Sequence, residues 1–90
     1  MRLLLNATFL GTAHDKVIAY AKGRSASAIL VCVNLDPDSF SECLVDVPGS
    51  LDLASTFPVV DMLTGAEYEW HLGGNYVRLP PGGAHVMAVR

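Results

Sequence analysis

The chain has 90 residues, of which 51% are hydrophobic and 17% are charged, and its formal net charge is −3. This length predicts one domain over residues 1–90, and a composition richer in apolar and poorer in charged residues than an average soluble domain excludes disorder. The acidic balance argues against a nucleic-acid partner, and no apolar run approaches the roughly 20 residues of a membrane-spanning helix, so no membrane is expected either.

The first residues, 1–12, are apolar but irregular, and the stretch ends near Gly11. We expect an irregular leading segment or a first strand there. The opening five residues resemble the start of a signal peptide. Because Asn6 and Thr8 interrupt the apolar core too early, we expect no cleaved leader.

Two apolar stretches, Lys16–Lys22 and Ala28–Leu35, follow with a polar turn between them and are expected to be hairpin neighbours. Alternation in the first places Ile18 and Tyr20 on one face. The second lacks a regular alternation of apolar and polar residues, which is typical of a central strand covered on both faces. The Asp-Pro-Asp-Ser sequence of Asp36–Ser39 predicts a turn that ends this strand.

The second half of the chain contains further short strand patterns separated by glycine and proline turns. Leu44 is expected to face outward from the strand Glu42–Val47, and Pro58 to keep the start of the strand Phe57–Leu63 at a sheet edge or outside the ladder. The predicted strands are Glu42–Val47, Phe57–Leu63, Glu67–His71, Tyr76–Leu79 and Ala84–Val89, with a hairpin joining the third and fourth. The pattern predicts an all-β fold, an antiparallel Greek-key-type β-sandwich of six to eight short strands.

Cys32 and Cys43 lie on strands expected to be neighbours, and the turn between them could bring the thiols close. Two buried free thiols are favoured over a disulfide, and two thiols alone do not close a tetrahedral zinc site. Asp36 and Asp38 offer only two of the six to eight oxygen ligands that calcium takes, so a role in the turn is favoured. No metal or cofactor is expected.

The candidate catalytic groups are scattered. Glu67 and Glu69 share one strand face at a spacing of about 7 Å and are expected to face solvent, whereas a retaining glycosidase pair needs carboxyl groups about 5–5.5 Å apart in a cleft. His14, His71 and His85 fall in three separate places, and nothing in the sequence brings one beside a nucleophile and an orienting acid. We therefore expect no catalytic residue in this chain.

Three aromatic residues, Tyr68, Trp70 and Tyr76, are expected on the two strands of one hairpin. An exposed strip of such rings can stack against the apolar faces of sugars, but cross-strand aromatic pairs also stabilise sheets without a ligand. Packing in the core or at an interface is favoured over a sugar platform. Arg78 is expected to be solvated or to pair with Glu67 or Glu69.

Several phrases stand in an order that resembles a known family. They are Asp15 with Ile18–Tyr20 and Lys22, then Val33–Pro37, Asp61–Gly65 with Tyr68 and Trp70, Asn75–Leu79, and Ala84–Val86. The series, from about Phe9 to Val89, resembles the C-terminal β-sandwich domain of the α-amylase superfamily. It is most similar to maltosyltransferases that extend α-1,4-glucans from maltose 1-phosphate, and less similar to trehalose synthases. Ala13, His14 and Pro80 depart from the family pattern.

The resemblance implies a non-catalytic accessory domain of a glucan-active, cytoplasmic glycosyltransferase. Catalysis in that family belongs to a (β/α)₈ barrel, which 90 residues cannot contain, so the expected partner is such a barrel or a second copy of the chain. Leu30, Cys32 and Leu44 are the candidate interface residues. The alternative is a stand-alone carbohydrate-binding module that uses Tyr68, Trp70 and Tyr76 to hold an α-glucan.

Overall fold

The computed structural model describes residues 7–23 and 25–90. The leader-like first five residues and Asn6 lie outside this range. The described residues contain eight strands: β1 (Ala7–Leu10), β2 (Val17–Lys22), β3 (Ile29–Asn34), β4 (Ser41–Val47), β5 (Thr56–Asp61), β6 (Glu67–His71), β7 (Gly73–Leu79) and β8 (Ala84–Val89). Two single-turn 3₁₀ helices, Ser25–Ser27 and Gly49–Leu51, lie between strands. Among the described residues, no helix has the length and apolar character needed to span a bilayer.

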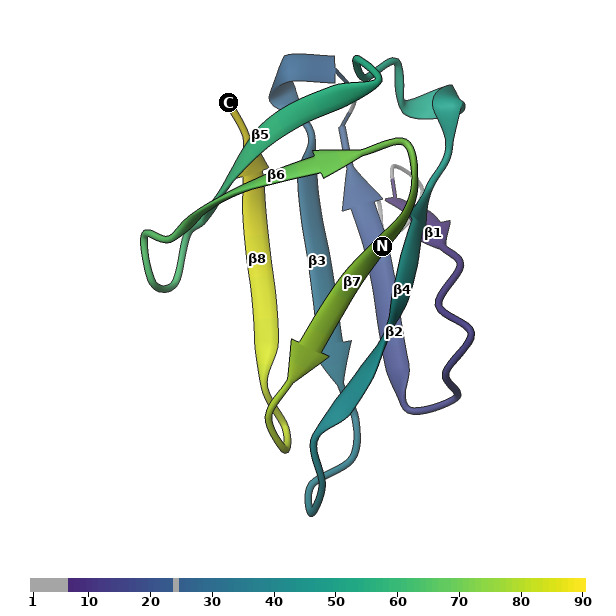
Figure 1. Cartoon of the computed structure of the whole chain (residues 1–90), viewed down its shortest axis with the longest axis vertical. Coiled ribbons are helices and arrows are strands. Elements are labelled where there is room, and N and C mark those ends of the chain that lie inside the picture. Colours follow the sequence, from purple (N-terminus) through teal and green to yellow (C-terminus); the bar gives the residue numbers. More distant parts are fainter. Residues whose placement is uncertain (1–6, 24) are drawn as a thin grey trace.

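The strands form two antiparallel sheets. Six strands pair in the order β1-β2-β3-β8-β5-β6, and β4 pairs with β7. Figure 1 shows β5 and β6 crossing β8 and β3 at a large angle, so the large sheet curls toward the layer that contains β4 and β7. The predicted all-β sandwich is therefore confirmed, as is the hairpin pairing of β2 with β3.

The core lies between the two layers and follows from strand alternation. Strands β2, β3, β4, β5 and β7 direct alternate side chains into it, as in the buried set Val17, Ala19 and Ala21 of β2, whereas β1, β6 and β8 each bury one residue. The buried core cluster also contains Leu10, Leu30, Cys32, Val45, Val47, Leu51, Phe57, Val59, Trp70, Val77, Leu79 and Met87. The predicted faces of β2 and the outward direction of Leu44 on β4 are confirmed.

Strand β3 is central, as predicted, since it pairs with β2 on one side and β8 on the other. Its two faces nevertheless differ. Leu30, Cys32 and Asn34 are buried between the sheets, whereas Ile29, Val31 and Val33 on the outer face are only half-buried. The expected cover on both faces is thus observed on the inner face alone.

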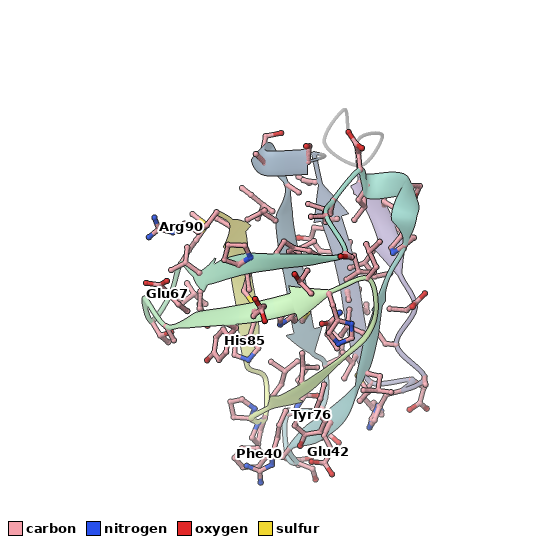
Figure 2. The ribbon with its side chains drawn as sticks, turned by 45° about the horizontal axis from the view of Figure 1, so that its top comes forward. Phe40, Glu42, Glu67, Tyr76, His85 and Arg90 are labelled. Atoms are coloured by element: carbon pink, nitrogen blue, oxygen red, sulfur yellow. The ribbon has the colours of Figure 1, made fainter. Side chains whose placement is uncertain are left out.

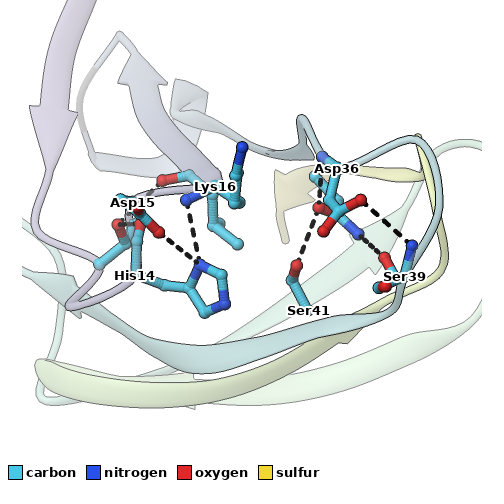
Figure 3. A network of polar contacts seen from close by, with 9 residues as sticks. His14, Asp15, Lys16, Asp36, Ser39 and Ser41 are labelled. Atoms are coloured by element: carbon cyan, nitrogen blue, oxygen red, sulfur yellow. Dashed lines mark hydrogen bonds and ion pairs between the residues drawn. The ribbon is translucent and has the colours of Figure 1, made fainter.

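A buried amide ties the end of β3 to two loops. The Nδ2 group of Asn34 donates to the carbonyls of Ser39 (3.0 Å), Leu79 (3.2 Å) and Pro80 (3.0 Å). Its Oδ1 accepts hydrogen bonds from the Asp36 backbone N–H and the Ser41 hydroxyl, both at 2.9 Å. Figure 3 shows Asp36, Ser39 and Ser41 gathered in this network.

The prediction that β6 and β7 form a hairpin is wrong. β6 pairs with β5, and β7 pairs with β4 in the other sheet. The side chain of Asn75 explains the crossing, because it accepts a hydrogen bond from the His71 N–H (3.0 Å) and donates to the carbonyls of His71 (2.8 Å) and Gly73 (3.1 Å). These bonds satisfy backbone groups that a hairpin ladder would otherwise pair, and Gly73 adopts a φ of +91° that favours glycine.

Pro58 meets one of its two expected positions: it does not lie at a sheet edge, but on the β8 side it lies just outside the paired residues, which begin at Val59. β5 is an interior strand between β8 and β6, and Pro58 lies within it, opposite Glu69. The Pro58 carbonyl accepts a hydrogen bond from Arg90, just beyond the last residue of β8. The missing N–H therefore faces the point where the neighbouring strand ends, which is how a proline is accommodated here. The strand ends at Asp61, two residues earlier than predicted.

Candidate functional site

A shallow groove opens where β6, β7 and β8 diverge. One lobe, of about 230 Å³, is lined by Tyr68, Trp70, Tyr76, Val77, Arg78, His85 and Met87. An adjoining lobe of about 260 Å³ shares Tyr68, Trp70 and Tyr76 and adds Glu69, His71 and Asn75. The groove exists because β6 is the last strand of one sheet and β7 belongs to the other, so no backbone ladder closes the space between them.

The three aromatic residues singled out from the sequence thus meet at one groove, although they do so across two sheets. Tyr68 and Trp70 share a face of β6, because they are two residues apart. Trp70 is 6% exposed and forms the floor, whereas Tyr68 is 45% exposed and Tyr76 is 61% exposed. Trp70 belongs to the core cluster, and the two tyrosines present ring surface to solvent.

Tyr76 is held in place by neighbours on the outer side of the small sheet. Its hydroxyl donates to Glu42 Oε2 at 2.6 Å, and this bond raises the pKa of Tyr76. Arg78 lies 3.9 Å from the same carboxylate oxygen and stacks over the ring of Phe40 at 4.2 Å. Figure 2 shows Tyr76, Glu42 and Phe40 together at one end of the β4–β7 sheet. Of the two expectations for Arg78, the solvated side chain is observed, at 57% exposure, and its ionic neighbour is Glu42 of β4 and not a glutamate of β6.

At the other side of the groove, His85 is oriented by a buried carboxylate. Asp61, which is 1% exposed, lies 2.9 Å from Nδ1 of His85 and accepts the N–H of Leu63 at 2.8 Å. Burial alone would raise the pKa of Asp61, but the backbone N–H of Leu63, the His85 imidazole and the backbone N–H of Thr64 together hold it below its usual value. The ionised carboxylate can only accept a hydrogen bond, so Nδ1–H of His85 donates to it and Nε2 is the ring nitrogen that this bond does not use.

The Asp61–His85 pair was not anticipated from the sequence. The two residues are 24 positions apart and meet because β5 and β8 are neighbours in the sheet. A signal was present, since each belongs to one of the phrases that carry the family resemblance. His85 also makes an edge contact with the ring of Tyr68, with centroids 6.3 Å apart. The histidine is therefore part of the groove wall.

A cysteine lies directly opposite this histidine. Cys32 pairs with His85 across β3 and β8, which puts Cys, His and Asp near one another on the inner side of the large sheet. Burial, with a smaller contribution from Cys43, raises the pKa of Cys32 to about 12. Because the thiolate is the nucleophilic form, this thiol is not activated for covalent catalysis. Both cysteines are free.

The other sequence candidates are dispersed. Asp36 serves its turn, since its Oδ1 accepts the N–H groups of Asp38 (2.9 Å) and Ser39 (3.2 Å). Glu67 and Glu69 are exposed on β6, as predicted. Among residues 7–23 and 25–90, no cluster of three or more His, Cys, Asp or Glu side chains could hold a metal ion.

The remaining two histidines bond locally. In the β1–β2 loop, Nδ1 of His14 accepts the N–H of Lys16 at 3.0 Å and lies 3.8 Å from Asp15 Oδ1 (Figure 3). Nδ1 of His71 donates to the carbonyl of Leu72 at 2.8 Å.

The candidate interface residues separate into two groups. Leu30 and Cys32 are each 0% exposed within the domain, so they contact its own core and are not available to a partner. Alternation explains this correction, because the half-exposed side chains of β3 are the odd-numbered ones, Ile29, Val31 and Val33. Leu44 does face solvent, at 56% exposure.

Comparison with known proteins identifies the family. The family model described as "GLGE, C-terminal" matches residues 9–89. The chain is 44% identical over 94 residues to α-1,4-glucan:maltose-1-phosphate maltosyltransferase 1 of Streptomyces coelicolor, covering 99% of this chain and 14% of the relative. It is 40% identical over 87 residues to the corresponding maltosyltransferase of Picrophilus torridus, covering 91% of this chain and 14% of that protein.

A solved structure supports the fold. The crystal structure of AmyP in complex with maltose aligns with a TM-score of 0.60 and 21% identity, over 88% of this chain and 16% of AmyP. The chain thus spans about one seventh of the length of its maltosyltransferase relatives. It belongs to the family of C-terminal domains of the α-1,4-glucan:maltose-1-phosphate maltosyltransferases.

Proposed function

We propose that this domain has no catalytic activity of its own and braces the catalytic (β/α)₈ barrel of a cytoplasmic maltosyltransferase that extends α-1,4-glucans. The barrel would be the remainder of a polypeptide about seven times longer, as the 14% coverage of the relatives suggests. The domain would pack against it through the outer face of the six-stranded sheet.

The observation that carries the proposal is the apolar character of that face. Phe9, Tyr20, Val31 and Val86 are paired in succession across β1, β2, β3 and β8, so they form one continuous row. A second row pairs Ile18 with Val33 and Ala84. We call these seven residues the outer face.

When one face of an antiparallel sheet is exposed to solvent, that face normally carries polar residues. Here Phe9 is 70% exposed and Ile18 is 39% exposed, and the central positions are half-buried valines. Contiguous apolar surface of this kind is characteristic of an interaction site. It is the expected surface of a domain that rests on a larger one.

The chemistry of the described residues is consistent with an accessory role. The Cys32 thiol is buried with its pKa raised, and Glu67 and Glu69 are exposed on β6. None of these groups forms an activated nucleophile or an acid–base pair in a cleft.

A chimera tests the proposal. The last 14% of the Streptomyces coelicolor relative is replaced by this chain, and maltosyl transfer to an α-1,4-glucan is measured beside the intact relative and a truncated form. We expect the chimera to retain transfer and thermal stability, the truncated form to lose them, and the 90-residue chain alone to transfer nothing. A chimera that behaves like the truncated form, or transfer by the chain alone, would refute the proposal.

Without a barrel, the outer face would meet a second copy of the chain. Sedimentation velocity at micromolar concentration is expected to show dimers, and Val31→Lys to give monomers, because a charged side chain in the middle of an apolar interface is costly to desolvate. Leu44→Lys, on the opposite sheet, is the matched control and should leave the dimer intact. Dimers that survive Val31→Lys would exclude the outer face as the contact.

A further inference from the structure

The backbone of β6 has one edge with no strand beside it. Among the described strands, β6 is the last of the six-stranded sheet and pairs with β5 alone. Pro58 of β5 stands opposite Glu69, and its carbonyl is bonded to Arg90 on the β8 side. Because bonded and unbonded pairs alternate in an antiparallel ladder, the N–H and C=O of Glu69 point away from β5, as do those of Glu67 and His71. We call these outward groups the free edge of β6.

At His71 the free edge already has a partner that imitates a strand. The side chain of Asn75 accepts a hydrogen bond from the His71 N–H at 3.0 Å and donates one to the His71 carbonyl at 2.8 Å. A bonded residue of an adjacent strand supplies the same donor and acceptor. In residues 7–23 and 25–90, the backbone groups of Glu67 and Glu69 make no hydrogen bond outside the β5–β6 ladder. The free edge therefore accepts a partner at one end and is unpaired along the rest.

The space beside the free edge is open. The lobe of about 260 Å³ adjoins it and is lined in part by Tyr68, Glu69 and Trp70. Figure 1 shows β7 diverging from β6 beyond the corner that joins them, so β7 does not cover this edge. A strand laid along β6 would point alternate side chains into the groove, against Tyr68 and Trp70, and the others toward solvent.

The side chains on the solvent side of β6 select the partner. Glu67 and Glu69 are both exposed there, and Figure 2 shows Glu67 at the end of the strand. Pairing of the free edge with that of a second copy would set the glutamates of the two chains beside each other, and such like-charge neighbours are destabilising. Lysine or arginine at those positions forms favourable cross-strand pairs instead. The net charge of −3 also attracts a basic segment.

We propose that the free edge of β6 binds an extended segment of a second protein as an added antiparallel strand, in which basic residues alternate with apolar ones. The residue opposite Glu69 in a bonded pair has its side chain on the same face, so the basic residues exchange backbone hydrogen bonds with Glu67 and Glu69. The apolar residues then enter the groove above Trp70. In strand addition the main-chain bonds supply affinity and the alternate side chains supply specificity. The choice of a separate protein rests on the proposed function, which assigns the barrel to the outer face.

The test uses the 90-residue chain and a fluorophore-labelled peptide that alternates lysine with valine, with binding followed by fluorescence anisotropy. We expect saturable binding that weakens as the salt concentration rises, because exposed charge pairs are screened. Backbone N-methylation of the lysines removes the N–H groups that face β6 and should weaken binding about tenfold or more. N-methylation of the valines, whose N–H groups face away, should have little effect. No binding up to about 1 mM, or equal binding of the two methylated peptides, would overturn the proposal.

Variants of the chain locate the site. Glu69→Pro removes the free-edge N–H and no ladder bond, and it should weaken binding about tenfold or more. Glu69→Gln keeps the N–H and removes the charge, so it should weaken binding less, about two- to fivefold. Asp15→Asn, in the β1–β2 loop, makes the same change in net charge and is the matched control. Circular dichroism confirms the fold of each variant, and wild-type affinity in Glu69→Pro would contradict the proposal. If Glu69→Pro does not fold, the methylated peptides still decide.

The chimera described above distinguishes this proposal from the accessory role. The peptide is titrated against the chimera as well, and we expect the same affinity as for the 90-residue chain because the outer face lies on the other side of the sheet. Binding by the chain but not by the chimera would show that the longer polypeptide covers the free edge, which would refute a separate partner. Maltosyl transfer is measured without peptide, so failure of the accessory role is observed independently.

Discussion

Replacement of Asn34 is the sharpest test of how the sandwich is held together. Its side chain makes five hydrogen bonds that join the end of β3 to the 36–41 loop and to the end of β7. The bond to the Leu79 carbonyl and the bond from the Ser41 hydroxyl are buried, so water cannot replace Asn34 at those two groups. Leaving a buried polar group unsatisfied costs about 1–3 kcal/mol.

We therefore expect Asn34→Ala to lower the free energy of unfolding by roughly 2–5 kcal/mol, a large part of the 5–15 kcal/mol typical of a domain. Urea unfolding followed by Trp70 fluorescence measures it. Asp38→Asn, exposed in the same turn, is the control and should change stability by less than about 0.5 kcal/mol. A loss below about 1 kcal/mol for Asn34→Ala would refute the reasoning, because it would mean that the network is dispensable.

Asn34→Asp keeps the shape of the side chain but removes its hydrogen-bond donors. The variant keeps an acceptor for Ser41 but places a carboxylate against the carbonyls that the Asn34 amide serves. The carbonyls disfavour the ionised form and raise the folded-state pKa of the new aspartate. Its destabilisation should therefore be smallest below the ordinary aspartate pKa and grow as pH rises through it. Destabilisation that is independent of pH would contradict this account.

Three further outcomes follow from individual environments. Because the pKa of Asp61 is lowered on folding, its contribution to stability is present at neutral pH and is lost as pH falls below about 3.8. Asp61→Asn should therefore flatten the acid limb of a profile of unfolding free energy against pH, and an unchanged limb would contradict this. Cys43 should react with a thiol reagent at pH 8 well before Cys32, whose thiol is buried with a pKa of about 12, and equal rates would disprove that burial. Gly83→Ala should lower the thermal unfolding temperature, since its Cβ would lie 2.6 Å from the ring of Pro80. Gly49→Ala is the control and should be nearly neutral, because its Cβ would meet no atom within 4 Å. Equal unfolding temperatures for the two variants would show that the loop at Gly83 can relax.

Local sequence patterns were sufficient to predict the strands and, for most of them, which face enters the core. Alternation in β2 and β4 identifies which side chains enter the core, because side-chain direction is a property of the single strand. The Asp36 turn was also predictable, since its carboxylate bonds to N–H groups two and three residues away. These features depend on neighbours in the sequence.

Features that depend on distant parts of the chain were not predictable. The pattern around Gly73 is the same for a hairpin and for a strand that crosses between sheets, and the bonds from Asn75 decide between them. The interior position of Pro58 depends on where β8 ends, and the Asp61–His85 pair depends on the β5–β8 pairing. Likewise, Leu30 is buried and Val31 is not because only one face of β3 is covered in the domain.

The central claim is that the outer face of the large sheet meets the catalytic region. Hydroxyl-radical footprinting of the chimera and of the 90-residue chain, the latter diluted until it is monomeric, tests it most directly. Phe9 and Tyr20 report on the outer face, and Phe40 and Tyr76 report on the opposite sheet. The account predicts strong protection of Phe9 and Tyr20 in the chimera with Phe40 and Tyr76 labelled as in the free chain. Equal labelling of Phe9 and Tyr20 in both proteins would contradict it.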